Sequence, residues 1–311
     1  MTAARLTLWI VQIMLVPLLS PYFIGFTRRI KARLQNRAGA TSFQPYRDIW
    51  KLLHKDEVIS EDASWLFRAA PYLIFATTLV IGASIPMLST ALTNSFTGDF
   101  LVVVYLVALG TFFLALAGID AGGAFGGFGS SREMLVAALT EGGLVLSLLT
   151  LALASRTTDL IAIAENIGSV PLAGYAPIAL AFISFFIAML AETSRYPFDN
   201  PATHLELTMI HEAMILEYSG KRLALMEWAA ANKYLIFLAL GANLFFPRGI
   251  AGALEAGPVM LALLVLLLKV GLLSAVIAVI ETSIAKLRIF RLPDLLFTSF
   301  VLSVIALGLV S

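Results

Sequence analysis

The sequence predicts an all-α protein: a polytopic membrane helix bundle of about eight transmembrane helices, with one further amphipathic helix at the membrane surface. Of its 311 residues, 59% are hydrophobic and only 13% are charged, whereas soluble domains are typically about 45–50% apolar and about 25% charged. The hydrophobic residues also gather in runs of about 20, the length that a helix needs to cross a bilayer. A membrane barrel would instead need strands of about 10 alternating residues.

Eight apolar runs are long enough to be candidate spans. The sixth is the weakest, because Asn232, Lys233 and Asn243 interrupt it. We treat residues 1–311 as a single integral membrane domain. The predicted spans are residues 6–26, 70–91, 100–119, 134–154, 172–191, 228–247, 258–281 and 293–310, and the longer loops are residues 27–69, 120–133, 192–227 and 282–292.

The basic residues predict the orientation of these spans. Most of the 21 Lys and Arg residues lie in the loops that follow the odd-numbered spans, and nine of them follow the first span. Short loops rich in Lys and Arg stay on the cytoplasmic side of a membrane. We therefore expect a multi-pass protein of the inner (plasma) membrane, with both termini outside and the longer loops in the cytoplasm.

Residues 43–56 are predicted to form the amphipathic helix. Phe43, Tyr46, Trp50 and Leu53 follow one another at spacings of three and four, with charged residues between them. This pattern is typical of a helix that lies in the headgroup plane. Such a helix either anchors the surface or forms one wall of a cavity that lipid or quinone can reach, and the sequence leaves both alternatives open.

Residues 118–133 form a glycine-rich stretch. It lacks the GK[ST] ending of a phosphate-binding loop and follows no predicted strand. We expect the glycines to allow two helices to approach closely and to form a turn between them.

The loop after the fifth predicted span concentrates charge beside the membrane, where charge is costly unless it has a partner or a function. A helix over residues 201–218 would place Glu206 and Glu217 on one face, because each residue turns an α-helix by about 100°. His204 and His211 would share a face as well. No third metal ligand accompanies the two histidines, so no metal site is predicted.

Ionisable side chains also lie inside the predicted spans or at their ends. A charge at the middle of the bilayer costs about 2.5–3.5 kcal/mol on insertion scales, so such groups should face the bundle interior. They form either a proton path or structural ion pairs that hold helices in register, and we favour the proton path for Lys269 and Glu141. The groups are Glu133, Glu141, Glu192, Lys269 and Glu281.

Several kinds of chemistry are excluded by the sequence. Cysteine is absent, so the chain holds no disulfide and no thiolate-ligated iron–sulfur cluster. No HExxH motif and no nucleophile elbow is present, and the net charge of +1 provides no basic face for nucleic acid. We expect a non-catalytic subunit with no cofactor of its own.

Four ordered segments, which together cover almost the whole chain, resemble a known family. They contain the runs RLQNRAG, GIDAGGAFGGFGSSRE, AETSRYPFD with EYSG, and ETSIAKLRI. These runs are similar to the loops of the membrane subunit 1 family of respiratory complex I. The resemblance is greatest to the formate hydrogenlyase and hydrogenase-4 component C branch of membrane-bound [NiFe]-hydrogenases. The segments are residues 33–58, 118–141, 191–220 and 281–289.

The resemblance implies a membrane-anchor and proton-coupling subunit, which links an iron–sulfur electron-transfer arm to antiporter-like, ion-translocating membrane subunits. Iron–sulfur clusters, and in the hydrogenase branch a [NiFe] centre, would then lie in soluble hydrogenase-like partners. The alternative is the quinone-binding subunit 1 of an NADH:quinone oxidoreductase, for which quinone is the ligand.

The same resemblance implies roles for individual residues. At His204 the sequence departs from the E-x-E-L pattern of the family, and histidine, which titrates near neutrality, can also relay protons. The proton-relay candidates are Glu133, Glu141, Glu192, Glu206, Glu217, Lys269 and Glu281, and the candidates for the docking and coupling loop are Arg195, Asp199, His204 and His211.

Overall fold

The computed structural model describes residues 3–92, 98–200 and 209–310, and in these ranges the protein is a bundle of α-helices without strands. This confirms the predicted fold class. The helices are α1 (Ala3–Leu34), α2 (Gln44–Leu53), α3 (Trp65–Ser84), α4 (Phe100–Asp120), α5 (Ala124–Ser155), α6 (Leu160–Ser169), α7 (Ala176–Glu192), α8 (His211–Ile215), α9 (Gly220–Leu244), α10 (Ala256–Ser283) and α11 (Leu292–Val310), with 3-10 turns η1 (Leu172–Tyr175) and η2 (Ile289–Arg291).

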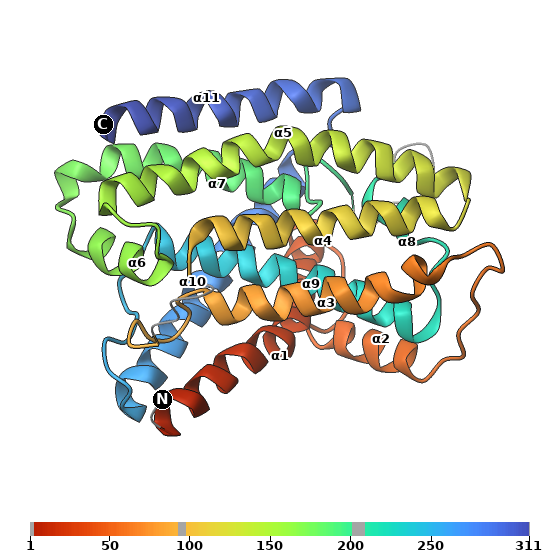
Figure 1. Ribbon diagram of the computed structural model, residues 1–311, viewed down its shortest axis with the longest axis horizontal. Helices are drawn as coiled ribbons and strands as arrows, with labels where there is room; N and C mark the ends of the chain where they lie inside the picture. The colour runs from red at the N-terminus through yellow and green to blue at the C-terminus, as the bar shows by residue number, and fades with distance from the viewer. Residues whose placement is uncertain (1–2, 93–97, 201–208, 311) are drawn as a thin grey trace.

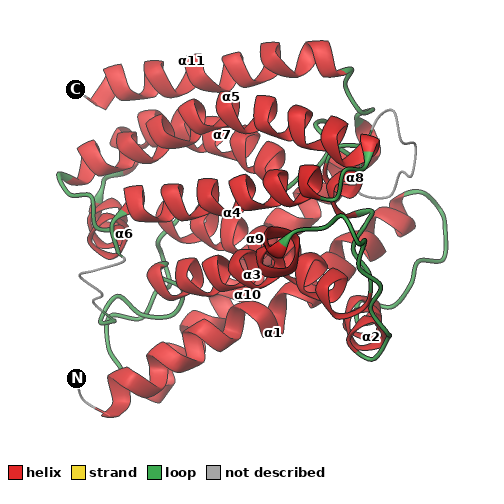
Figure 2. Ribbon diagram, turned by 45° about the vertical axis from the view of Figure 1, so that its right-hand side comes forward, coloured by secondary structure: helices red, strands yellow, loops and turns green. Residues whose placement is uncertain are grey.

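The helices α3, α4, α5 and α11 lie side by side in that order and form one face of the bundle (Figures 1 and 2). Helix α9 crosses the centre, where it packs against α1, α2, α3 and α10. Both termini lie at one end of the molecule, and α2 and α8 lie at the other (Figure 1). We call this second end the loop-rich end, because it carries residues 35–64, 121–123, 193–200 and 209–219.

Seven helices in the described ranges are long and apolar enough to cross a membrane. They correspond to seven of the eight predicted spans. The eighth, residues 172–191, is the 17-residue helix α7, which is about 25 Å long and at the lower limit for crossing. Three helices extend eight or more residues beyond the predicted spans, since α1 continues to Leu34, α5 begins at Ala124 and α9 begins at Gly220. Hydropathy detects only the apolar part of a helix that continues out of the membrane.

The glycine-rich stretch allows the close contact that the sequence predicts. A Cβ atom at Gly126 would lie 2.1 Å from the carbonyl oxygen of Gly118, so α4 and α5 can meet there only through glycine. Between the two helices, Gly122 has a φ of +71°, a conformation that costs glycine little. The pair therefore forms a tight helical hairpin at the loop-rich end.

Helix α2 confirms the predicted amphipathic helix and combines its two suggested roles. Pro45 and Ile49 are buried against the bundle, where they line a cavity. Trp50 on the opposite side is 66% exposed, as an aromatic anchor at the headgroup level would be. The helix is thus a cavity wall and a surface element at once.

Of the possible helix over residues 201–218, the first part, residues 201–208 with His204 and Glu206, lies outside the described residues. In the described part, His211–Ile215 form α8, and Glu217 lies beyond the end of that helix. The carboxylate of Asp199 accepts hydrogen bonds from the backbone N–H groups of Ile210 and His211, at 3.3 and 3.0 Å. These bonds satisfy N–H groups at the start of α8, and so the chain begins a new, short helix there.

Candidate functional site

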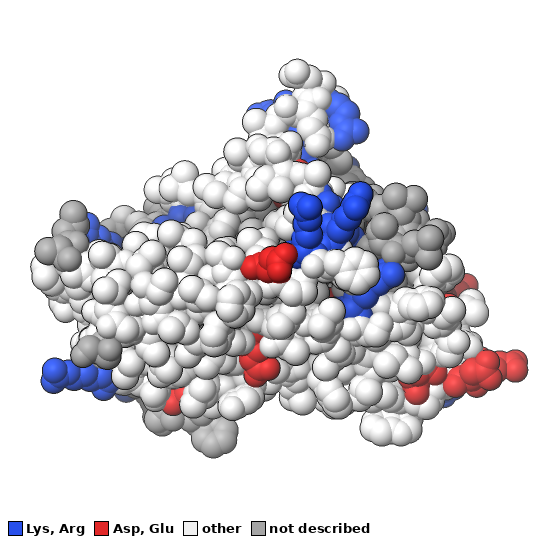
Figure 3. Space-filling model, turned by 90° about the horizontal axis from the view of Figure 1, so that it is seen from above, with Lys and Arg blue, Asp and Glu red and all other residues white. Residues whose placement is uncertain are grey.

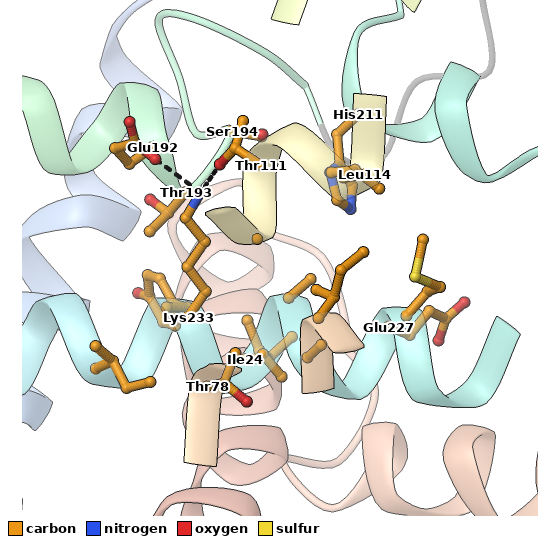
Figure 4. Close-up of a pocket in the computed structure, with 18 of the residues that line it drawn as sticks. Ile24, Thr78, Thr111, Leu114, Glu192, Thr193, Ser194, His211, Glu227 and Lys233 are labelled. Atoms are coloured by element: carbon orange, nitrogen blue, oxygen red, sulfur yellow. Dashed lines mark hydrogen bonds and ion pairs between the residues drawn. The ribbon is translucent and has the colours of Figure 1, made fainter. Parts of the chain in front are cut away.

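A cavity of about 170 Å³ lies at the loop-rich end, between α1, α2, α3, α4, α9 and the segment that follows α7. Apolar side chains such as Ile24, Ile49 and Ile74 form part of its wall. Hydroxyl and ionisable side chains form much of the rest, and they come from helices far apart in sequence (Figure 4). The ionisable Asp, Glu, Lys, Arg and His residues that line it are Arg28, Asp48, Glu133, Glu192, Arg195, His211, Glu212, Glu227 and Lys233.

Lys233 of α9 and Glu192 of α7 form an ion pair on this wall, with 2.7 Å between Nζ and Oε2. Lys233 also donates a hydrogen bond of 3.1 Å to the hydroxyl of Thr111 on α4. Figure 4 shows the lysine reaching across the cavity to both partners. The pair joins three helices, and its carboxylate is only 7% exposed.

Glu133 of α5 is a second buried acid on the same wall, with 5% of its surface exposed. Lys233 and Glu192 line the same cavity. One lysine and two buried carboxylates therefore lie around a single cavity at the loop-rich end.

A second cluster lies where α1, α10 and the segment after α7 meet. Glu281 bonds Arg195 through one carboxylate oxygen, at 3.3 Å, and Lys31 through the other, at 3.2 Å. The guanidinium of Arg195 also lies 4.4 Å from the ring centre of Tyr234, a favourable cation–π distance. Arg195 is 6% exposed, so the cluster is a buried ionic network.

Asp199 organises the loop that follows. Its carboxylate pairs with Lys286, at 2.6 Å, and accepts the N–H bonds at the start of α8. Only 2% of Asp199 is exposed. Because Leu287 also donates its N–H to the carbonyl of Pro197 at 3.0 Å, the segment after α10 is bonded to the segment after α7.

His211 begins α8 and lines the cavity. Burial lowers the pKa of His211 from 6.5 to about 4, and the nearby cations Lys233 and Arg195 add to this effect, while Asp199 opposes it. The imidazole is therefore neutral at pH 7. A neutral imidazole offers one donor and one acceptor nitrogen to the cavity.

The lowered pKa of His211 predicts a pH-dependent stability. Between pH 6.5 and 4 the unfolded chain takes up a proton that the folded chain does not, so stability falls as the pH drops through this range. The loss at pH 5 should be about 2 kcal/mol relative to pH 7. The check is to compare unfolding in mixed micelles at the two pH values. We expect His211→Gln to lose this part of the pH dependence, and an equal slope in both proteins would contradict the prediction.

Not every predicted site residue joins this site. Glu192, Glu133, Arg195 and His211 line the cavity, and Asp199 and Glu281 adjoin it. Two other candidates, Glu141 and Glu217, are exposed. Lys269 lies on α10 near the C-terminal end of α9 and donates hydrogen bonds to Asn243, at 3.1 Å, and to the carbonyl of Phe246, at 2.6 Å. The proton-relay roles of all these residues remain predictions.

Sequence reasoning missed the central cation of the site. In the sequence Lys233 only interrupts the weakest span, yet α9 is the most buried of the spans in the described ranges. Polar residues in a membrane helix face the bundle interior, so the low hydropathy of this span could have indicated its central place. Arg28, Asp48 and Glu227 line the cavity as well and were not singled out.

Comparison with known proteins places these observations in a family. A family model described as NADH dehydrogenase matches residues 6–311. Formate hydrogenlyase subunit 4 of Escherichia coli (strain K12) is 32% identical over 291 residues, which cover 94% of this chain and 94% of that protein. Hydrogenase-4 component C of the same organism is 34% identical over 298 residues, which cover 95% of this chain and 92% of that protein.

More distant proteins are similar to this chain as well. A subunit of the NADH-quinone oxidoreductase of Cytophaga hutchinsonii is 28% identical, over 75% of this chain and 73% of that protein. In the solved structure of the membrane-bound sulfane sulfur reductase, an archaeal respiratory membrane complex, one chain superposes with a TM-score of 0.86 at 18% identity. The match covers 99% of both chains. At this identity the likeness shows the fold alone.

Proposed function

We propose, since this chain belongs to the NADH dehydrogenase family, that it is the membrane-anchor and proton-coupling subunit of a complex-I-like respiratory or hydrogenase assembly. The observation that carries the proposal is the run of buried charges at the loop-rich end, from Glu133 through Lys233 and Glu192 to Arg195 and Glu281. Membrane proteins retain such groups where they move ions or protons.

The two charged clusters are connected through a short piece of chain. Glu192 ends α7, and Arg195 follows it by three residues, so a shift of this segment moves a member of each cluster. A change of charge beside the cavity would alter the proton affinities of Glu192 and Glu133. This supports a path in which an event in a soluble partner at the loop-rich end transfers a proton into the bundle.

The redox centres belong to partners under this proposal. Since the chain has no cysteine, thiolate-held iron–sulfur clusters must lie in another polypeptide. The curated relatives are named as parts of formate hydrogenlyase and hydrogenase-4, which favours soluble iron–sulfur and hydrogenase-like partners, with a [NiFe] centre in one of them. Antiporter-like membrane subunits would complete the assembly, in a plasma membrane whose cytoplasmic side faces the loop-rich end.

The anchor role predicts where the soluble partners go when this chain is removed. Deletion of its gene from the host should release the iron–sulfur partners from the membrane, so that their membrane-bound fraction falls by about tenfold, as expected when the specific interface of the arm is lost. The measurement is quantitative mass spectrometry of sedimented membranes and supernatant. Expression of the wild-type chain from a plasmid is the control. Partners that stay on the membrane without this chain would contradict the anchor role.

A second candidate function is quinone binding, which the apolar part of the cavity favours. Pro45 and Ile49 of α2 line the cavity beside Ile24 of α1, so the wall lies at the membrane surface where a lipid-soluble ligand could enter. Under this alternative, quinone-site inhibitors should stop electron transfer, and purified complex should carry quinone. Turnover that is indifferent to such inhibitors would favour the anchor function alone.

A further inference from the structure

Glu141 lies apart from the acids of the two charged clusters. It lies near the middle of α5, more than about 20 Å from either end of that helix, and its side chain is exposed on the outside of the bundle. Within the described part of the chain it makes no hydrogen bond and no ion pair. Glu192 and Glu281, in contrast, each have a cation within 3.3 Å.

The surface around Glu141 is otherwise apolar. On α5, Met134 and Leu135 are exposed beside it. On the flanking helix α11, the ring of Phe300 would lie 3.1 Å from a Cβ atom at Gly142, so α11 packs against α5 at the residue that follows Glu141. We call this surface the α5 face; its exposed members include Leu109, Met134, Ala138, Glu141, Phe297 and Phe300.

Figure 3, which views the molecule from above Figure 1, shows a surface that is mostly uncharged, with small groups of Lys and Arg and of Asp and Glu side chains near its middle and its ends. Helix α10 shows what a surface covered by lipid looks like in this protein. Its most exposed side chains, such as Leu261, Leu264 and Leu268, are all apolar, at 58–63% exposure. The α5 face has the same apolar character except for one carboxylate at mid-membrane depth, and an ionised carboxylate is costly against hydrocarbon. Something other than lipid should therefore cover it.

We propose that the α5 face is the docking surface for a transmembrane helix of another subunit, which carries a Lys or Arg side chain opposite Glu141. Charge complementarity selects this occupant, because the unpaired carboxylate lacks only a cation to match the ion pairs inside the bundle. The aromatic side chains of α11 would pack beside it, as aromatic residues do at interfaces. This inference rests on the proposed function, in which the chain works within a membrane assembly.

Crosslinking in native membranes tests the docking surface. The chain has no cysteine, so single-cysteine variants carry a photoactivatable maleimide crosslinker at one known place. Ala138→Cys lies about one turn before Glu141 and should yield an adduct with another membrane protein, in roughly tenfold higher yield than Leu264→Cys on α10. Adducts with lipid alone, or only between two copies of this chain, would overturn the proposal.

The charge of the partner is tested by substitution at Glu141 itself. The amount of membrane partner that co-purifies should fall in the order Glu, Gln, Lys, with a loss of about tenfold or more for Glu141→Lys. Glu165→Lys is the matched control, because Glu165 is exposed on α6. If the Glu141→Gln variant co-purifies with as much membrane partner as the wild type does, the partner surface opposite Glu141 is not cationic. If the wild type itself co-purifies with no membrane protein, the proposed function fails, whereas partners that remain with Glu141→Lys overturn this inference alone.

Discussion

Replacement of Glu281 by Ala is expected to lower the free energy of unfolding by about 3–5 kcal/mol, because it leaves two cations without their counter-charge in a buried site. Arg195 and Lys31 both bond the carboxylate of Glu281, which is 2% exposed. The guanidinium of Arg195 would retain the ring of Tyr234, but a cation–π contact is worth only about 0.5–2 kcal/mol. The free energy can be measured by unfolding the purified chain in mixed micelles.

A substitution on the same helix provides the control for this loss. Glu255 precedes α10, is exposed, and makes no cap hydrogen bond with its side chain. Glu255→Ala should therefore change the free energy of unfolding by less than about 0.5 kcal/mol. If the Glu281→Ala variant were no less stable than the Glu255→Ala variant, the cluster of Glu281, Arg195 and Lys31 would not hold the helices together.

Replacement of Lys233 by Met should have the largest effect on function. Lys233 pairs with Glu192 and lines the same cavity as Glu133, and without it the buried carboxylate of Glu192 loses its counter-charge. Proton transfer through the pair should then slow, and we expect turnover of the assembled complex to fall by roughly 10²-fold, within the range for the loss of a positioned proton-transfer group. Turnover is measured with the electron donor and acceptor of the purified complex.

Thr111→Val is the matched control, because it removes the second partner of Lys233 and keeps the ion pair with Glu192. It should retain most of the turnover. A Thr111→Val variant as inactive as Lys233→Met would mean that the position of the lysine, and not its charge, is what matters.

The predicted fold was largely correct because the membrane helices were assigned from hydropathy, and hydropathy gives the length of each apolar run. Hydropathy does not show whether a side chain on a helix points into the bundle or out of it. Glu141 and Glu192 were both assigned to the bundle interior, yet the structure turns Glu141 outward on α5 and Glu192 toward α9. One residue along a helix changes the direction by about 100°, and only the packing of α4, α7 and α11 around α5 decides which side is outside.

The candidate site was predicted only in part, again because the sequence pattern does not show which side chains meet in the folded bundle. The acids in the loop after α7 were found because they lie close together in the sequence, but Lys233 was noted only as an interruption of the sixth predicted span. Its role depends on contact with Glu192, which lies far earlier in the sequence and meets it only in the folded bundle. Asp199 could likewise be singled out from the sequence as a candidate residue. Its bonds to the start of α8 and to Lys286 could not be predicted, because they depend on how the loops after α7 and α10 fold.

The ratio of ions moved to electrons transferred tests the central claim most directly. The double variant Glu192→Gln with Lys233→Met replaces the buried pair by neutral groups of similar size, a change that tends to preserve stability. With that complex in proteoliposomes, we predict that electron transfer still occurs while the ratio falls below about half of the wild-type value, because the paired groups that take up and release the proton are gone. A complex that assembles normally and keeps the wild-type ratio would contradict the account.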